Sequence, residues 1–131
     1  MSRDHKKLRV FHDAHYLTTT IYRQTRQFPS AELFGLRAQM RRAAVSVACN
    51  IVEGSARSTG RDYLRFLNVA LGSASELWYL VDLAAELGLV NGVGWAATGT
   101  QCGAVVRQLQ RLTNQVELFG AQGGQVGRQR P

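Results

Sequence analysis

One stretch of the sequence, residues 41–54, combines small apolar residues with polar side chains at a helical spacing. Steps of three and four residues place these polar side chains in one row along a helix. The row consists of Gln39, Arg42, Ser46, Asn50, Glu53 and Arg57. An amide, hydroxyl, carboxylate and guanidinium in one row could bind a ligand. They could equally hold two helices in register through buried hydrogen bonds.

Metal chemistry has one weak candidate, a pair of histidines. His12 and His15 are three residues apart and could present two ligands on one side of a helix, with His5 as a third. Asp13 lies between them in the sequence and should point elsewhere. We therefore interpret the three histidines as surface residues and expect no metal and no cofactor.

Catalytic chemistry has no recognisable constellation of residues. Ser46, Ser73 and Ser75 have no histidine base at a predictable distance. Residues 54–60, GSARSTG, lack the Gly-Lys-Ser/Thr of a phosphate-binding P-loop. We expect that the protein is not an enzyme and that none of its residues is catalytic.

Hydrophobic periodicity predicts an all-α fold of four helices over residues 8–27, 31–56, 60–87 and 95–119. Breaks at Phe28-Pro29, at the polar turn before Gly60 and at Gly88 separate them, and Ser30 is the predicted N-cap of the second helix. Short connections favour an antiparallel up-down-up-down bundle. The predicted domains are a flexible basic N-terminus (1–7), the bundle (8–119) and a disordered tail (120–131).

Antiparallel pairing of the second and third helices predicts which side chains meet. Centred on the turn near residue 58, this register brings Arg42 within reach of Glu76. It also lets Glu53 reach Arg61 or, together with Asn50, Arg65. Because buried polar groups need partners, we expect a structural polar network. Its predicted members are Arg42, Ser46, Asn50, Glu53 and Glu76.

The third and fourth helices carry the strongest apolar patterns. Over residues 60–87 the apolar face is much broader than the stripe of about 100° typical of a surface helix. This helix is either central in the bundle or also contacts another subunit. The fourth helix shows a coiled-coil-like seam. Its members are Trp95, Thr98, Cys102, Val105, Leu109, Leu112, Val116 and Phe119.

Composition narrows the class of protein further. The chain of 131 residues carries a net charge of +7, and residues 66–106 contain no Lys or Arg. Cys49 and Cys102 lie within apolar patterns, so we expect reduced, buried thiols and a cytoplasmic protein. No apolar run approaches the roughly 20 residues needed to cross a membrane, and no apolar signal core follows the basic N-terminus.

The basic charge favours an acidic partner, RNA or DNA above all. The arginines predicted to contact phosphates are Arg37, Arg41, Arg57, Arg61 and Arg65. The aromatic residues fall in the core pattern and not among these arginines, so we expect no base readout by stacking. A protein-interaction scaffold, whose partner itself handles nucleic acid, is the alternative.

Two long strings carry a resemblance to a known family. Residues 28–57, FPSAELFGLRAQMRRAAVSVACNIVEGSAR, and residues 63–90, YLRFLNVALGSASELWYLVDLAAELGLV, resemble the four-helix-bundle family of the 23S rRNA intervening sequences, often labelled S23 ribosomal proteins. The resemblance covers roughly residues 8–119. Ala48 stands where the family usually has proline, and residues 88–103 match poorly.

The resemblance implies an antiparallel bundle that assembles into a homopentamer. It also implies a gene that, in some bacteria, lies within an insertion in the 23S rRNA gene. A related fold, the accessory protein of diversity-generating retroelements, is a basic pentamer that binds nucleic acid and a reverse transcriptase. A reverse transcriptase is accordingly one protein partner that the resemblance suggests.

Overall fold

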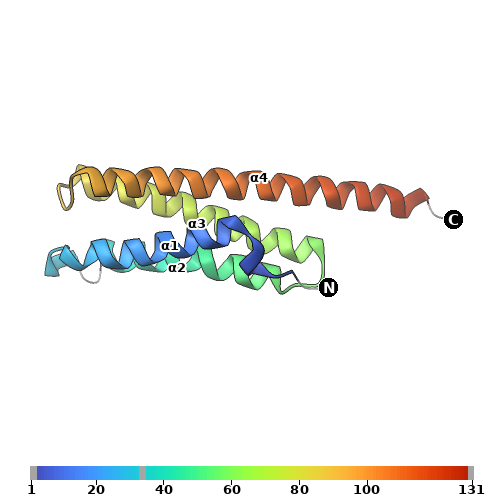
Figure 1. Ribbon diagram of the computed structural model, residues 1–131, viewed down its shortest axis with the longest axis horizontal. Coiled ribbons are helices and arrows are strands. Elements are labelled where there is room, and N and C mark those ends of the chain that lie inside the picture. Colours follow the sequence, from blue (N-terminus) through green and yellow to red (C-terminus); the bar gives the residue numbers. More distant parts are fainter. Residues whose placement is uncertain (1–2, 33–34, 130–131) are drawn as a thin grey trace.

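The computed structural model describes the backbone of residues 3–32 and 35–129, and the side-chain surroundings up to Phe119. It contains four α-helices, α1 (Arg9–Gln24), α2 (Leu36–Ser55), α3 (Gly60–Glu86) and α4 (Val93–Gln129). Successive helices run antiparallel, and the N-terminal segment lies beside the turn between α2 and α3 (Figure 1). The all-α four-helix fold predicted from the sequence is confirmed. None of the helices described is long and apolar enough to cross a membrane.

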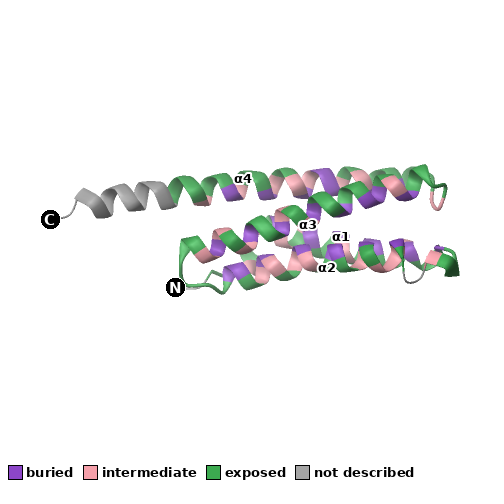
Figure 2. Ribbon diagram, turned by 180° about the vertical axis from the view of Figure 1, so that it is seen from behind, coloured by how far each residue is buried: buried purple, intermediate pink, exposed green. Residues whose placement is uncertain are grey.

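One apolar stripe from each helix forms the core, and buried residues recur along the inner sides of the helices (Figure 2). Each fully buried Leu or Ile side chain contributes about 1.5–3 kcal/mol relative to an exposed one. The largest fully buried side chains in the core are Leu17, Ile21, Met40, Ile51, Leu67, Leu77 and Leu109. A spacing of three and four residues is what places these side chains on one inner face of each helix.

The broad apolar face of α3 is explained mainly by its place in the bundle, between α2 and α4. Leu67 and Leu77 are fully buried, and Trp78 packs against the backbone of α4 at Gly103. A Cβ at Gly103 would lie 3.0 Å from Trp78 Cζ2, so only glycine allows this approach. Of the two alternatives, a central helix accounts for most of the pattern.

The start of α2 differs from the sequence prediction. Ser30 belongs to a short 3₁₀ turn (Ser30–Glu32), and α2 begins only at Leu36. Glu32 Oε2 accepts a hydrogen bond from the Leu36 backbone N–H at 3.2 Å. A carboxylate in this position satisfies one of the unpaired donors at the helix start and interacts favourably with its dipole. Ser30 is therefore not the N-cap of α2; Glu32 provides that capping contact.

The bounds of α4 also differ from the prediction. The helix begins at Val93, directly after Gly92 with φ of +96°, and continues to Gln129. The predicted end at Phe119 is therefore too early. The separate tail predicted for residues 120–131 stays a prediction, and residues 130–131 lie outside the described residues. Gly120 lies within this helix, because a glycine inside a helix costs only about 1 kcal/mol and does not break it.

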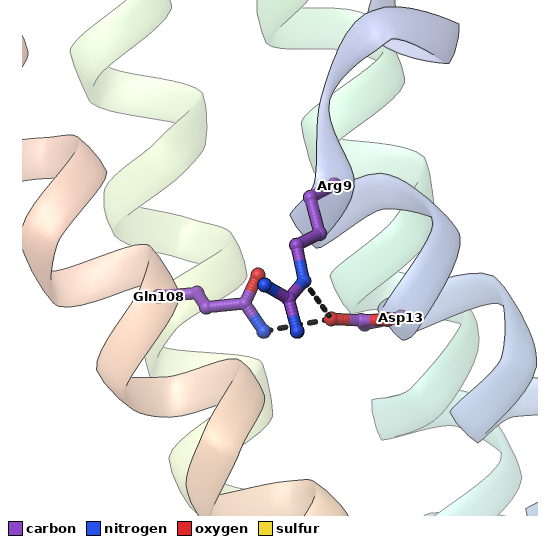
Figure 3. Close-up of polar contacts among 3 residues, drawn as sticks. All are labelled: Arg9, Asp13 and Gln108. Atoms are coloured by element: carbon purple, nitrogen blue, oxygen red, sulfur yellow. Dashed lines mark hydrogen bonds and ion pairs between the residues drawn. The ribbon is translucent and has the colours of Figure 1, made fainter.

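Amide side chains join α1 to α4. Gln108 Nε2 donates to Asp13 Oδ2 at 2.8 Å, and Arg9 Nε lies 3.7 Å from the same oxygen (Figure 3). Towards the other end of α1, Thr98 Oγ1 donates to Gln24 Oε1 at 2.7 Å. The Arg9 side chain is 89% exposed, so its ion pair contributes little and the amide contacts fix the pairing.

Candidate nucleic-acid interface

Three members of the polar row on α2 contact α3 or each other. Ser46 Oγ and Ser73 Oγ share a hydrogen bond of 2.8 Å. Asn50 Nδ2 donates to the Ser46 carbonyl at 2.8 Å and to Ser46 Oγ at 3.1 Å. Gln39 Nε2 donates to Glu76 Oε1 at 3.2 Å. These pairs match the predicted register between the two helices, so this part of the row holds the α2–α3 interface.

The other members of the predicted network lie differently. Arg42 and Glu53 are exposed, and in the described part of the chain neither forms a hydrogen bond or ion pair through its side chain. Glu76 is bound by Gln39 and not by Arg42, and Asn50 bonds within its own helix and not to Arg65. Spacing and register predicted Arg42 and Glu53 for this network, but both are exposed whereas Ser46 and Asn50 are half-buried.

At the α2–α3 turn, arginine side chains lie over aromatic rings. The Arg57 and Arg65 guanidinium carbons are 4.6 and 4.8 Å from the centre of the Phe66 ring. Arg3 lies 4.1 Å from the centre of the Tyr63 ring. The prediction that the aromatic residues would be separate from the arginines is therefore wrong here. Stacking on rings orients the guanidinium groups without neutralising them.

Arg3 belongs to the basic N-terminus, which was expected to help in binding, but the sequence did not place it at this turn. It was assigned to a flexible N-terminus, yet its backbone N–H donates to the Ser55 carbonyl at 2.7 Å and its Nη1 donates to the Arg57 carbonyl at 3.3 Å. We call Arg3, Arg57, Arg61 and Arg65 the turn cluster. No sequence pattern links Arg3 to the others, because the fold alone brings residues so far apart in the chain together.

The helix ends position the turn cluster. Thr59 Oγ1 accepts from the Asp62 backbone N–H at 3.1 Å and caps α3. On the other side of the turn, Gly54 lets α2 approach α3 so closely that a Cβ there would lie 3.0 Å from Phe66 Cβ. The ring that carries Arg57 and Arg65 is thus fixed by a backbone contact.

Arg41 lies elsewhere and has a structural role. Its Nε donates to Thr25 Oγ1 and its Nη2 to the Tyr22 carbonyl, both at 3.0 Å, and the guanidinium lies over the Tyr22 ring. It therefore caps the end of α1. Burial, followed by the neighbouring charge of Arg37, lowers the pKa of Arg41 from its usual value.

Arg41 and Arg57 are 16 residues apart on or next to one helix, a separation of about 24 Å at 1.5 Å per residue. The five arginines predicted to contact phosphates therefore form two groups. Arg37 and Arg41 lie near the end of α1, and the other three belong to the turn cluster.

Replacement of Arg41 by alanine is expected to lower the free energy of unfolding by about 1–2 kcal/mol. The change removes two charge-assisted hydrogen bonds from a partly exposed side chain, which places the loss low in the range for such bonds. Urea denaturation followed by circular dichroism measures the loss. Arg42→Ala is the matched control on the same helix and should change stability by less than about 0.5 kcal/mol. Equal losses in both variants would contradict the capping role of Arg41.

The histidines and cysteines offer no second site. His12 Nε2 donates to the Lys6 carbonyl, and the rings of His5 and His15 pack on Phe11. Within residues 3–32 and 35–119, no three potential ligands gather to hold a metal ion. Cys49 is exposed, contrary to the prediction that both thiols are buried.

Cys102 is buried, as predicted, and its surroundings make it unreactive. Burial, helped by the charge of Asp82, raises the pKa of the Cys102 thiol to about 12. At neutral pH the thiol is therefore protonated, and a protonated thiol is neither a nucleophile nor a metal ligand.

The protein is an antiparallel bundle with a basic turn, and its described part contains no catalytic constellation. It therefore belongs to the class of basic all-α proteins. The sequence model of the 23S rRNA-intervening sequence protein family matches residues 6–111. The chain belongs to that family, and this confirms the resemblance noted in the sequence.

A solved structure supports the same fold. A protein of unknown function from the S23 ribosomal protein family of Bacteroides thetaiotaomicron VPI-5482 superposes with a TM-score of 0.73 at 18% identity. The match covers 80% of the present chain and 95% of that one. No curated protein matches the chain.

Proposed function

We propose that this protein is a non-catalytic, oligomeric nucleic-acid-binding bundle whose phosphate-binding surface is the turn cluster. The observation that carries the proposal is the set of four arginines gathered at one end of α2 and α3, three of them lying over aromatic rings. In the part of the chain that the structure describes, none of the four forms an ion pair with a carboxylate. Such a group of charges is available to phosphate oxygens.

Among the five arginines predicted from the sequence, their surroundings favour the turn cluster over Arg37 and Arg41. Arg41 holds the end of α1 through its Nε and Nη2 hydrogen bonds, so it would have to give up these contacts to turn fully towards a phosphate. Arg57, Arg61 and Arg65 are exposed. We therefore assign binding to the turn cluster and leave Arg41 out of it.

The proposal includes assembly into an oligomer, for which a pentamer is the expected size. Outward-facing apolar residues on α2 and α3 support it, since Val45, Val69 and Tyr79 are 38%, 48% and 63% exposed. An exposed apolar surface of this kind is typical of a subunit contact. Sedimentation equilibrium against the chain mass of 14.5 kDa measures the state, and a monomer would contradict this part of the proposal.

Binding is tested with labelled RNA and DNA, single-stranded and duplex, across a salt series. The double variant Arg57→Ala/Arg61→Ala is expected to weaken binding. It should also reduce the slope of log K against log salt by about 1 for each phosphate that an arginine no longer neutralises. Helicity should stay unchanged because both side chains are exposed. Circular dichroism checks that expectation.

The matched control is Arg26→Ala/Arg42→Ala, which removes the same charge from exposed positions away from the turn. This control variant should keep most of the slope of log K against log salt. Equal weakening in the two double variants would indicate a diffuse effect of net charge. No binding by the unaltered protein even at low salt would refute the proposal. In that case, capture of a protein partner from nuclease-treated extract would favour the scaffold alternative, with a reverse transcriptase as one candidate.

A further inference from the structure

Beside the turn cluster, the surface is hollowed by an open groove of about 770 Å³. Its walls come from the N-terminal segment, the start of α3 and the second half of α4. We call it the Phe119 groove. Its lining residues are Arg3, Ser58, Gly60, Arg61, Tyr63, Leu112, Gln115, Val116 and Phe119.

One side of the groove favours an anion. Arg3 and Arg61 are its two charged lining residues, and no carboxylate is among the lining side chains. The side also includes the first residues of α3, where backbone N–H groups have no partner within the helix and the dipole is positive. Burial raises the pKa of Tyr63, so its hydroxyl stays protonated at neutral pH.

The other side of the groove is apolar and presents an aromatic ring. Leu112 and Val116 are partly buried against the core, whereas the Phe119 ring is 78% exposed. The sequence pattern placed Phe119 in the seam of α4. It is exposed because the contact between Trp78 and Gly103 sets the register of α4 on α3, which places Phe119 at the level where α3 begins. A large exposed ring beside arginines suits a ligand with an anionic part and a flat, apolar part.

We propose that the Phe119 groove binds an unpaired nucleotide of a single-stranded nucleic acid, with its phosphate at Arg3 and Arg61 and its base stacked on the Phe119 ring. This inference rests on the proposed function and specifies its substrate. In a duplex the base faces are covered by neighbouring bases, so only phosphates and base edges are accessible. An unpaired base has a free face, and stacking on an aromatic side chain is the usual way proteins hold it.

The test uses a labelled oligouridine and an RNA duplex, each of about 12 units, within the roughly 4–16 nucleotides that one single-strand-binding module covers. Phe119→Ala is expected to weaken oligouridine binding about tenfold or more and to leave duplex binding unchanged. Phe119→Tyr keeps the aromatic ring and should bind oligouridine as the unaltered protein does. Leu118→Ala is the matched control, because Leu118 is 64% exposed, neighbours Phe119 and does not line the groove.

Each other outcome has a defined meaning. If the unaltered protein binds duplex but not oligouridine, the inference fails and the proposed function stands. If it binds neither, both fail. Equal effects of Phe119→Ala and Leu118→Ala, or equal losses on duplex and single strand, overturn the stacking role. A lower oligomeric state for Phe119→Ala in sedimentation would make the ring a subunit contact and also overturn the inference.

Discussion

Replacement of Trp95 by alanine is expected to lower the free energy of unfolding by about 3–5 kcal/mol. Trp95 is only 6% exposed and lies in the first turn of α4. Its ring packs against Phe28 with 6.0 Å between ring centres, and its Nε1–H donates to the Val81 carbonyl of α3 at 2.9 Å. The substitution leaves a cavity where three parts of the chain meet.

Urea denaturation followed by circular dichroism at the helical band measures the loss without relying on tryptophan fluorescence. Trp95→Phe is the matched control. It keeps most of the packing and removes one hydrogen bond, worth about 1 kcal/mol, from a carbonyl that already lies inside a helix. The phenylalanine variant should therefore lose clearly less than the alanine variant. Similar losses would mean that the hydrogen bond and not the packing anchors the start of α4.

The burial of Trp95 also shows why much of the fold could be predicted from the sequence. The seam that begins with Trp95 is buried as far as Leu109. A helix whose apolar residues recur every three or four positions has one apolar face, and it buries that face against the core. The same reasoning failed where a helix end depends on a contact from outside the pattern. The α2 helix begins at Leu36, whose N–H is bonded by the preceding Glu32, and propensity alone does not encode that contact.

The candidate site was less predictable than the fold. Arg57, Arg61 and Arg65 were singled out by charge and by their place at a turn, which are local properties. Arg3 and Phe119 join them only through tertiary packing of the two ends of the chain. Arg41 shares the charge of the others, but its hydrogen bonds to the end of α1 could not be read from spacing.

Replacement of Gly54 by alanine is expected to lower the free energy of unfolding by about 1–3 kcal/mol, although alanine is the better helix former by about 1 kcal/mol. The added Cβ would lie 3.0 Å from Phe66 Cβ and 3.4 Å from the Tyr63 carbonyl oxygen. Neither atom is the end of a flexible side chain, so the two helices would have to separate. Because Arg57 and Arg65 lie over Phe66, the same shift should also weaken the proposed nucleic-acid binding.

Gly72→Ala separates these two effects, since Gly72 is exposed within α3 and a Cβ there meets no atom within 4 Å. It should raise the free energy of unfolding by about 0.5–1 kcal/mol and leave binding unchanged. The two glycine-to-alanine changes are thus expected to shift the free energy of unfolding in opposite directions. Because helix propensity favours alanine at both positions, the difference measures the effect of the close approach of α2 to α3. Stabilisation by both substitutions would show that the helices at the turn can separate at little cost. The Phe66 ring would then not be held rigidly under Arg57 and Arg65, and this support for the turn cluster would be lost.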